Sequence, residues 1–169
     1  QLEITIQTVE MGLEMAKEHG ALTLLNPSPS IRLSSDILSA VDFLVPNELE
    51  AQFLTGLKMK CERDIPKIAK RLLDHGVKNV VITLGSKGLF FKNQIEKIWM
   101  KAFSVNVVDT TAAGDAFMGA LACGLAENRP IRDILKFANG AGALATTKLG
   151  AQPSLPFKKE LEKFLLKMI

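Results

Sequence analysis

The sequence of 169 residues lacks several features that would assign it to a special class of protein. It has only two cysteines, Cys61 and Cys123, far apart and without the paired spacing of a zinc site or a disulfide framework. It has one tryptophan, no tyrosine and no apolar run long enough to span a bilayer. Its formal net charge is only +3, and no basic block is interleaved with aromatic residues. We therefore expect a cytoplasmic protein with reduced thiols that binds neither membranes nor nucleic acid.

The composition is that of a folded protein, with 47% apolar and 23% charged residues. A chain of this length predicts a single α/β domain over residues 1–169 with a substantial core. The first residues, 1–6, read as the tail of a strand and do not begin with methionine. We therefore expect a chain cut from something longer, or one whose first half is missing.

Apolar periodicity, glycines and prolines predict an alternation of strands and helices. Because strands and helices alternate through residue 84, the sequence predicts a mostly parallel sheet with helices on both faces, in three α/β/α layers. The expected helices cover residues 6–19, 34–40, 47–55, 62–74, 114–127, 131–147 and 157–168. The expected strands cover residues 21–25, 41–45, 77–84, 88–93, 95–101 and 103–107.

Ligands of parallel sheets bind beyond the carboxyl ends of the strands. The loops at Asn26, Asn47, Gly85 and Asp109 each follow an expected strand. We therefore expect these loops to lie along one edge of the sheet. Neither GxxxxGK[ST] nor GxGxxG occurs in the chain, so the phosphate loops of those two motifs are excluded.

The most informative segment reads DTTAAGDAFMGAL, from Asp109 to Leu121. It places Asp115 in the first turn of an expected helix, behind a run of small residues. Open N–H groups at a helix start attract anions, phosphate above all. A carboxylate beside such a pocket can take a proton from an attacking hydroxyl. The alternative is that Asp115 only complements the helix dipole, as Asp does in many first turns.

Two further segments carry polar groups at expected strand ends. Asn47 and Glu50, three residues apart in PNELE, share one helical face. They form either a capping box or a polar pair that holds water around a metal–nucleotide complex. The turn TLGSKG, from Thr83 to Gly88, carries glycines that permit a close approach to phosphate or ribose, although a tight turn needs them equally.

The segment NGAGALATTKLGAQPS, from Asn139 to Ser154, begins as a helix of very small residues. Small side chains over several turns let another helix pack closely, and they equally admit a flat ligand. Both interpretations stay open at this point.

Taken in order, five segments resemble ribokinases, within the carbohydrate and purine kinase family that includes fructokinase and adenosine kinase. The segments are LNPSP, VPNELEAQFLTG, VITLGSKG, VDTTAAGDAFMGALA and GAQPS, and the resemblance is collinear from residue 1 to residue 169. It implies a ribokinase-like, Rossmann-like α/β/α fold. It also implies phosphoryl transfer from ATP to a sugar hydroxyl, with ribose converted to ribose 5-phosphate.

The resemblance also implies roles for individual residues. Asp115 would be the catalytic base and would contact the sugar together with Glu3, while the amides of Ala112, Ala113 and Gly114 would bind the transferring phosphate. Glu50 would organise Mg²⁺ through water. The implied nucleotide pocket consists of Asn47, Thr83, Leu84, Gly85, Ser86, Lys87, Gly88, Gly114 and Asn139. The implied K⁺ site, largely of carbonyl oxygens, consists of Asp109, Thr111, Ala145, Lys148, Gly150 and Ser154.

Two departures from the family pattern limit what the resemblance implies. Many members have glycine where this chain has Ala112, and alanine there is strained if φ is positive. The N-terminal half, which carries most sugar contacts and a β-sheet lid, has no counterpart here. The alternatives are therefore an inactive fragment that only binds nucleotide, or another sugar kinase such as a fructokinase. An uncovered sheet edge would favour a homodimer.

Overall fold

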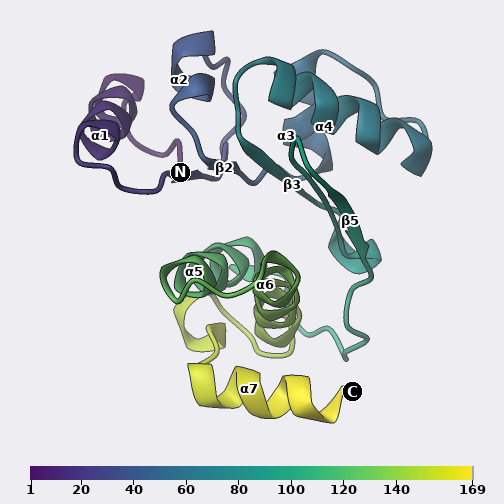
Figure 1. The fold of residues 1–169 in the computed structure, drawn as a ribbon. Helices are drawn as coiled ribbons and strands as arrows, with labels where there is room; N and C mark the ends of the chain where they lie inside the picture. Colours follow the sequence, from purple (N-terminus) through teal and green to yellow (C-terminus); the bar gives the residue numbers. More distant parts are fainter. Residues whose placement is uncertain (169) are drawn as a thin grey trace. The chain divides into compact units, whose positions relative to one another are not determined.

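The computed structural model describes residues 1–168, and the chain divides into two compact units (Figure 1). The first unit comprises residues 1–85 and 89–99 and contains the sheet. The second comprises residues 86–88 and the chain from Met100 onward, and it is built from helices. A single domain over residues 1–169 stays a prediction.

The first unit is an α/β structure. Its helices are α1 (Ile6–Glu18), α2 (Ser35–Ser39), α3 (Glu48–Thr55) and α4 (Ile65–Asp74), with the 3-10 turn η1 (Glu62–Asp64) before α4. The strands of the sheet are β1 (Leu24–Leu25), β2 (Phe43–Leu44), β3 (Asn79–Thr83), β4 (Leu89–Lys92) and β5 (Lys97–Met100). The expected helices and the hairpin at residues 88–101 are thus confirmed, with small shifts at their ends.

The strands follow the order β1-β2-β3-β4-β5 in one mixed sheet. β1, β2 and β3 run parallel, and β4 returns antiparallel to β3 with Val80 opposite Lys92. Because β1, β2 and β3 run in the same direction, the residues that follow them, Asn26, Asn47 and Gly85, come from the same edge of the sheet. The sequence-based prediction is therefore confirmed for these three loops.

The helix boundaries have local causes in the sequence. The Thr5 hydroxyl caps α1 by accepting from the amide of Thr8, and Ser34 caps α2 by accepting from Ile37. α3 ends at Gly56, whose φ of 68° belongs to the left-handed region that glycine adopts without a steric cost.

The parallel strands are shorter than the apolar runs that predicted them. The strands begin at Leu24 and Phe43, and just before them the Thr23 carbonyl accepts from the amides of Asp42 and Phe43 at 3.2 and 2.9 Å. The Thr23 amide donates to the Asp42 carboxylate at 2.9 Å, and the Asp42 amide donates to the Thr23 hydroxyl at 2.8 Å. Main-chain and side-chain bonds therefore both link these two segments just before the strands.

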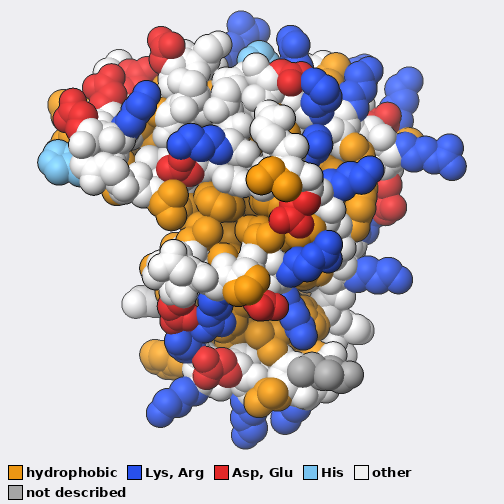
Figure 2. Space-filling model, viewed as in Figure 1, with side chains coloured by type: hydrophobic (Ala, Val, Ile, Leu, Met, Phe, Trp, Pro, Cys, Tyr) orange, Lys and Arg blue, Asp and Glu red, His pale blue; other side chains and the backbone are white. Residues whose placement is uncertain are grey.

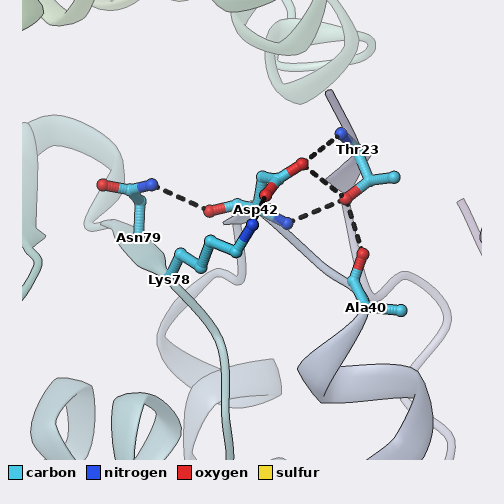
Figure 3. Close-up of polar contacts among 5 residues, drawn as sticks. All are labelled: Thr23, Ala40, Asp42, Lys78 and Asn79. Atoms are coloured by element: carbon cyan, nitrogen blue, oxygen red, sulfur yellow. Dashed lines mark hydrogen bonds and ion pairs between the residues drawn. The ribbon is translucent and has the colours of Figure 1, made fainter. Parts of the chain in front are cut away.

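This polar cluster joins the amino ends of the three parallel strands (Figure 3). The Lys78 ammonium lies 2.6 Å from the Asp42 carboxylate, and the Asn79 amide donates to the Asp42 carbonyl at 3.0 Å. Thr23 also donates to the carbonyl of Ala40 at 2.7 Å. Burial raises the pKa of Asp42, but the contacts with Lys78 and Thr23 outweigh it and hold that pKa below its ordinary value.

Two predicted strand segments are wrong. Residues 103–107 form no strand among the described residues, and neither do residues 1–6, of which Ile6 already begins α1. A strand requires a paired neighbour. Directly after residues 103–107, the chain is not paired as a strand. The amides of Val108 and Asp109 both donate to the carbonyl of Thr146 instead.

The second unit consists of α5 (Ala113–Ala126), α6 (Ile131–Ala145) and α7 (Lys158–Lys167), with the 3-10 turn η3 (Gln152–Ser154). The turn η2 (Gly85–Lys87) spans the boundary between the units along the chain. α5 and α6 lie side by side (Figure 1). A Cβ on Gly142 of α6 would lie 3.2 Å from the carbonyl oxygen of Ala113 in α5. The small residues of α6 therefore serve close helix packing, as one of the two interpretations predicted.

The core of the first unit is apolar, with Val41, Leu44, Ile65, Leu72 and Val80 almost fully buried. On the face shown in Figure 2, acidic side chains gather over α1 and basic ones over α4. Cys61 and Cys123 are both exposed and form no disulfide within residues 1–168. Within residues 1–168, no helix is long and apolar enough to cross a membrane.

Candidate active site

The start of α5 is an abrupt turn into a helix. Ala112, the residue before the helix, has φ 58° and ψ 11°, the left-handed conformation. The sequence-based concern about Ala112 is therefore justified, because an L-residue there carries strain of about 1–2 kcal/mol. Asp115 lies in the first turn, and its side chain is exposed. Its carboxylate is thus accessible and not enclosed in the apolar core.

A single carboxylate fixes the loop that leads into this turn. One oxygen of Asp109 accepts from the amide of Thr111 at 2.9 Å and from its hydroxyl at 2.7 Å. The other oxygen accepts from the amide of Gly150 at 2.9 Å. These bonds, those of Thr111 first, lower the pKa of Asp109, so the group stays ionised at neutral pH. Asp109 therefore ties the loop before α5 to the loop after α6.

Two of the three amides expected to bind phosphate remain open. The amide of Ala113 donates to the Thr110 carbonyl at 3.3 Å, a long bond within the first turn. The amides of Ala112 and Gly114 have no hydrogen-bond acceptor among the described residues. Open amides and the helix dipole together give this turn a positive potential.

Other members of the predicted cation set lie in the same unit. Ser154 is fully buried and its hydroxyl donates to the Ala151 carbonyl at 2.7 Å. Ala145 is buried at the end of α6, and the Lys148 ammonium lies 3.2 Å from the Glu160 carboxylate. The Asp109 carboxylate thus joins Thr111 and Gly150 directly, while Lys148 and Ser154 bond to Glu160 and Ala151.

Asn47 and Glu50 form a capping box at the start of α3. The Asn47 side-chain oxygen accepts from the Glu50 amide at 2.9 Å, and the Glu50 carboxylate accepts from the Asn47 amide at 2.8 Å. The structural interpretation of this pair is therefore confirmed. The oxygen of Asn47 accepts this bond, and the NH₂ group of the exposed side chain is the group that can donate to a ligand.

The strand-end turn TLGSKG is shared between the units. In the first unit, Thr83 is bridged to Asn47 in parallel, with its amide donating to the Pro46 carbonyl at 3.0 Å, and Leu84 is buried. In the second unit, Ser86 and Lys87 are exposed and Gly88 is buried. The bridge places Asn47 beside Thr83 at the carboxyl edge of β2 and β3.

Asn139, predicted to bind nucleotide, and Glu3, predicted to contact the sugar, lie in different surroundings. Asn139 is buried within α6 and donates to the Lys101 carbonyl at 2.8 Å. Glu3 is exposed in the chain before α1. No group of three or more His, Cys, Asp or Glu residues that could hold a metal occurs in residues 1–168. Mg²⁺ commonly binds through one or two carboxylates, waters and substrate phosphates, and Glu50 at the start of α3 is a carboxylate of this kind.

Comparison with known proteins decides the family. The family model described as pfkB family carbohydrate kinase matches residues 1–158. The chain belongs to this family. The pfkB assignment and the fold agree, since a solved ribokinase of Arabidopsis thaliana, complexed with ribose and ATP, superimposes with a TM-score of 0.93 at 32% identity. That comparison covers 98% of this chain and 54% of the Arabidopsis chain.

Curated pfkB relatives show the same extent of similarity. A ribokinase of Haemophilus influenzae is 39% identical over 165 residues, covering 98% of this chain and 54% of its own length. A deoxyribokinase of Salmonella typhi is 36% identical over 166 residues, again covering 54% of its length. The chain thus spans about half the length of the curated relatives it matches, with a ribokinase-like α/β fold.

Sequence reasoning missed two groups near these positions. The Thr146 carbonyl accepts from the amides of Val108 and Asp109, and the Lys101 carbonyl accepts from Asn139. Both act through the main chain. No side-chain pattern could have identified them, because every residue carries the same carbonyl group.

Proposed function

We propose that the protein to which this chain belongs transfers a phosphoryl group from ATP to a hydroxyl group of a sugar, with ribose as the substrate. The supporting observation is the start of α5, where open amides, a left-handed Ala112 and an exposed Asp115 lie within one turn. The 39% identity to a ribokinase supports the choice of sugar. The 36% identity to a deoxyribokinase makes 2-deoxyribose the substrate to compare.

In this proposal Asp115 accepts the proton of the attacking hydroxyl group. The amides of Ala112 and Gly114 donate to the oxygens of the transferring phosphoryl group, where charge develops in the transition state. Removal of one such donor costs about 3 kcal/mol in other enzymes. Ala113 contributes only if its long bond to Thr110 gives way.

The nucleotide is proposed to bind along Thr83–Gly88, next to the NH₂ group of Asn47. Mg²⁺, when bound with ATP, offsets the charge of the phosphates. The free oxygen of Glu50 would hold a water of that ion. This role is compatible with the capping box, which uses one carboxylate oxygen of Glu50.

K⁺ is proposed to bind beside the loop that Asp109 fixes, among carbonyl oxygens of the segment from Ala145 to Ser154. A bound cation would strengthen the positive potential at the adjacent start of α5. K⁺ should therefore raise turnover relative to Na⁺ and to tetramethylammonium. Equal rates in the three salts, at constant ionic strength, would remove the cation site from the account.

The substrate is tested by steady-state phosphorylation of ribose, 2-deoxyribose and fructose with MgATP. The assay uses a protein that contains this chain and is as long as its relatives. We expect the largest kcat/KM for ribose. A larger value for fructose or 2-deoxyribose would assign the chain to another sugar kinase of the family.

A second candidate is a nucleotide-binding protein without turnover, because this chain covers only 54% of its relatives' length. Calorimetric titration of the 169-residue chain with MgATP separates the cases. The second candidate would be favoured if this chain binds MgATP while a protein of the same length as its relatives phosphorylates none of the three sugars. Phosphorylation of any of the three sugars would exclude it.

A further inference from the structure

Asn139 is a polar residue in the buried face of α6. The residue is 8% exposed, and its neighbours Phe137, Ala138, Gly140 and Ala141 are all buried. A buried amide group is costly unless it is hydrogen-bonded. The NH₂ group of Asn139 meets this requirement by donating to the Lys101 carbonyl at 2.8 Å, 38 residues away along the chain. The peptide of Lys101 thereby gains a fixed position on α6, although it lies outside regular structure.

The Lys101 peptide also packs closely against Gly88, the last residue of the turn Ser86–Gly88. A Cβ on Gly88 would lie 2.0 Å from the Met100 carbonyl oxygen and 2.6 Å from both the Lys101 carbonyl carbon and the Ala102 amide nitrogen. The φ of Gly88 is +102°, which L-residues rarely adopt. The main chain of Gly88 therefore packs directly against the main chain of residues 100–102, with no side chain between the two segments.

We propose that Asn139 is a positioning residue for the turn Ser86–Gly88, acting through the Lys101 carbonyl. Gly88 is buried and packs directly on the main chain of residues 100–102, which gives this turn a fixed contact within the second unit. A turn held in place before a ligand arrives loses less conformational entropy on binding. The inference that this favours a nucleotide rests on the proposed function.

Two other roles for Asn139 lead to different expectations. If Asn139 touches the nucleotide directly, its replacement alters binding but leaves the free protein unchanged. If Asn139 only satisfies a buried carbonyl, its replacement lowers global stability without a local effect on the turn. The positioning role requires local loosening of residues 86–88 in the free protein.

The first test is hydrogen exchange of the free 169-residue chain, read by mass spectrometry on peptides that span residues 84–90. Asn139→Asp keeps the shape of the side chain but removes its donor and faces the Lys101 carbonyl with a carboxylate. We expect exchange at residues 86–88 to become about tenfold faster, as expected for the loss of one buried hydrogen bond. Exchange in α5 should stay unchanged.

Two variants control for folding and for specificity. Asn139→Gln keeps the NH₂ donor and should retain most of the protection. Lys101→Ala removes an exposed side chain but keeps the carbonyl, so it should match the wild type. Exchange at residues 86–88 that is unchanged in Asn139→Asp, or equally increased in Lys101→Ala, would overturn the positioning role.

The second test is titration with MgATP and MgGTP. Asn139→Asp should weaken both by the same factor, about tenfold, whereas Asn139→Gln should restore most of the affinity. A loss confined to one nucleotide would indicate direct contact with the base and contradict the proposal. If the wild type binds neither nucleotide, the proposed function fails, while the exchange experiment still decides the positioning role.

Discussion

Replacement of Gly88 by alanine should destabilise the second unit far more than replacement of Gly150. Both glycines have a strongly positive φ, +102° and +89°, so an alanine is strained by about 1–2 kcal/mol at either position. Part of that strain is offset by the lower entropy of the unfolded alanine variant, by about 0.4–1 kcal/mol. These two effects are similar at both sites and cancel in the comparison.

The surroundings of the added methyl group differ. At Gly150 the nearest atoms are side-chain carbons of Pro153 at 3.7 and 3.9 Å, which is ordinary contact. At Gly88 the Met100 carbonyl oxygen lies 2.0 Å away and would have to retreat by more than 1 Å, as would the backbone attached to it. Overpacking of this kind costs about 1–3 kcal/mol, and the shift would also strain the bond from Asn139 to Lys101, worth about 1 kcal/mol.

We therefore expect Gly150→Ala to lower the free energy of unfolding by about 1 kcal/mol, and Gly88→Ala by about 3–5 kcal/mol. Urea titration followed by far-UV circular dichroism measures both values in the 169-residue chain. Equal losses in the two variants would show that the close packing of Gly88 on residues 100–102 is absent, and would refute the reasoning.

Three further predictions use single substitutions. Ala112→Gly should raise the free energy of unfolding by about 0.5–1 kcal/mol, since the relieved left-handed strain exceeds the added entropy of the unfolded chain; a less stable glycine variant in urea titration would contradict it. Asn47→Asp should keep the helix cap within about 0.5 kcal/mol but weaken MgATP binding, whereas Asn47→Ala should lose about 1 kcal/mol of stability; calorimetry giving unchanged affinity in the Asp variant would remove Asn47 from the nucleotide site. Asp42→Asn should cost about 2–3 kcal/mol at pH 7, because the ion pair with Lys78 is lost and the hydrogen bonds from Thr23 are no longer made to a charged acceptor. The pKa of Asp42 is lower in the folded state, so its contribution to stability is complete above the ordinary pKa of 3.8 and is lost as the pH falls through the folded pKa. The free energy of unfolding of the Asp42→Asn variant should therefore fall less steeply with pH at the acid end.

Local signals predicted some elements almost to the residue. Pro46 and Asn47 before α3 and Gly56 after it define a helix by capping alone, and the structure agrees. The apolar runs that contain β1 and β2 overestimated the length of both strands. Just before the strands, side-chain bonds between Thr23 and Asp42 accompany the main-chain bonds to the Thr23 carbonyl. Such contacts depend on two segments meeting in space, which a single segment does not reveal.

The sequence predicted side chains of the candidate site and the amides at the start of α5, but it did not predict two of the main-chain contacts around them. The DTTAAGD motif identified Asp109 and Asp115, and the structure shows the Asp109 bonds to Thr111 and Gly150. Residues 103–107 alternate like a strand, but they form no strand within the described part of the chain. The anchoring carbonyls of Thr146 and Lys101 carry no side-chain signature, so only the folded structure reveals them.

Asp115→Asn tests the central claim most directly, because it keeps the shape of the side chain and removes its basicity. In the protein at the length of its relatives, ribose phosphorylation should fall by about 10²–10⁴-fold in kcat, the usual contribution of a general base. The Kd for MgATP, measured by calorimetry on the same preparation, should change little. Turnover within a fewfold of the wild type, with MgATP still bound, would show that Asp115 is not the base.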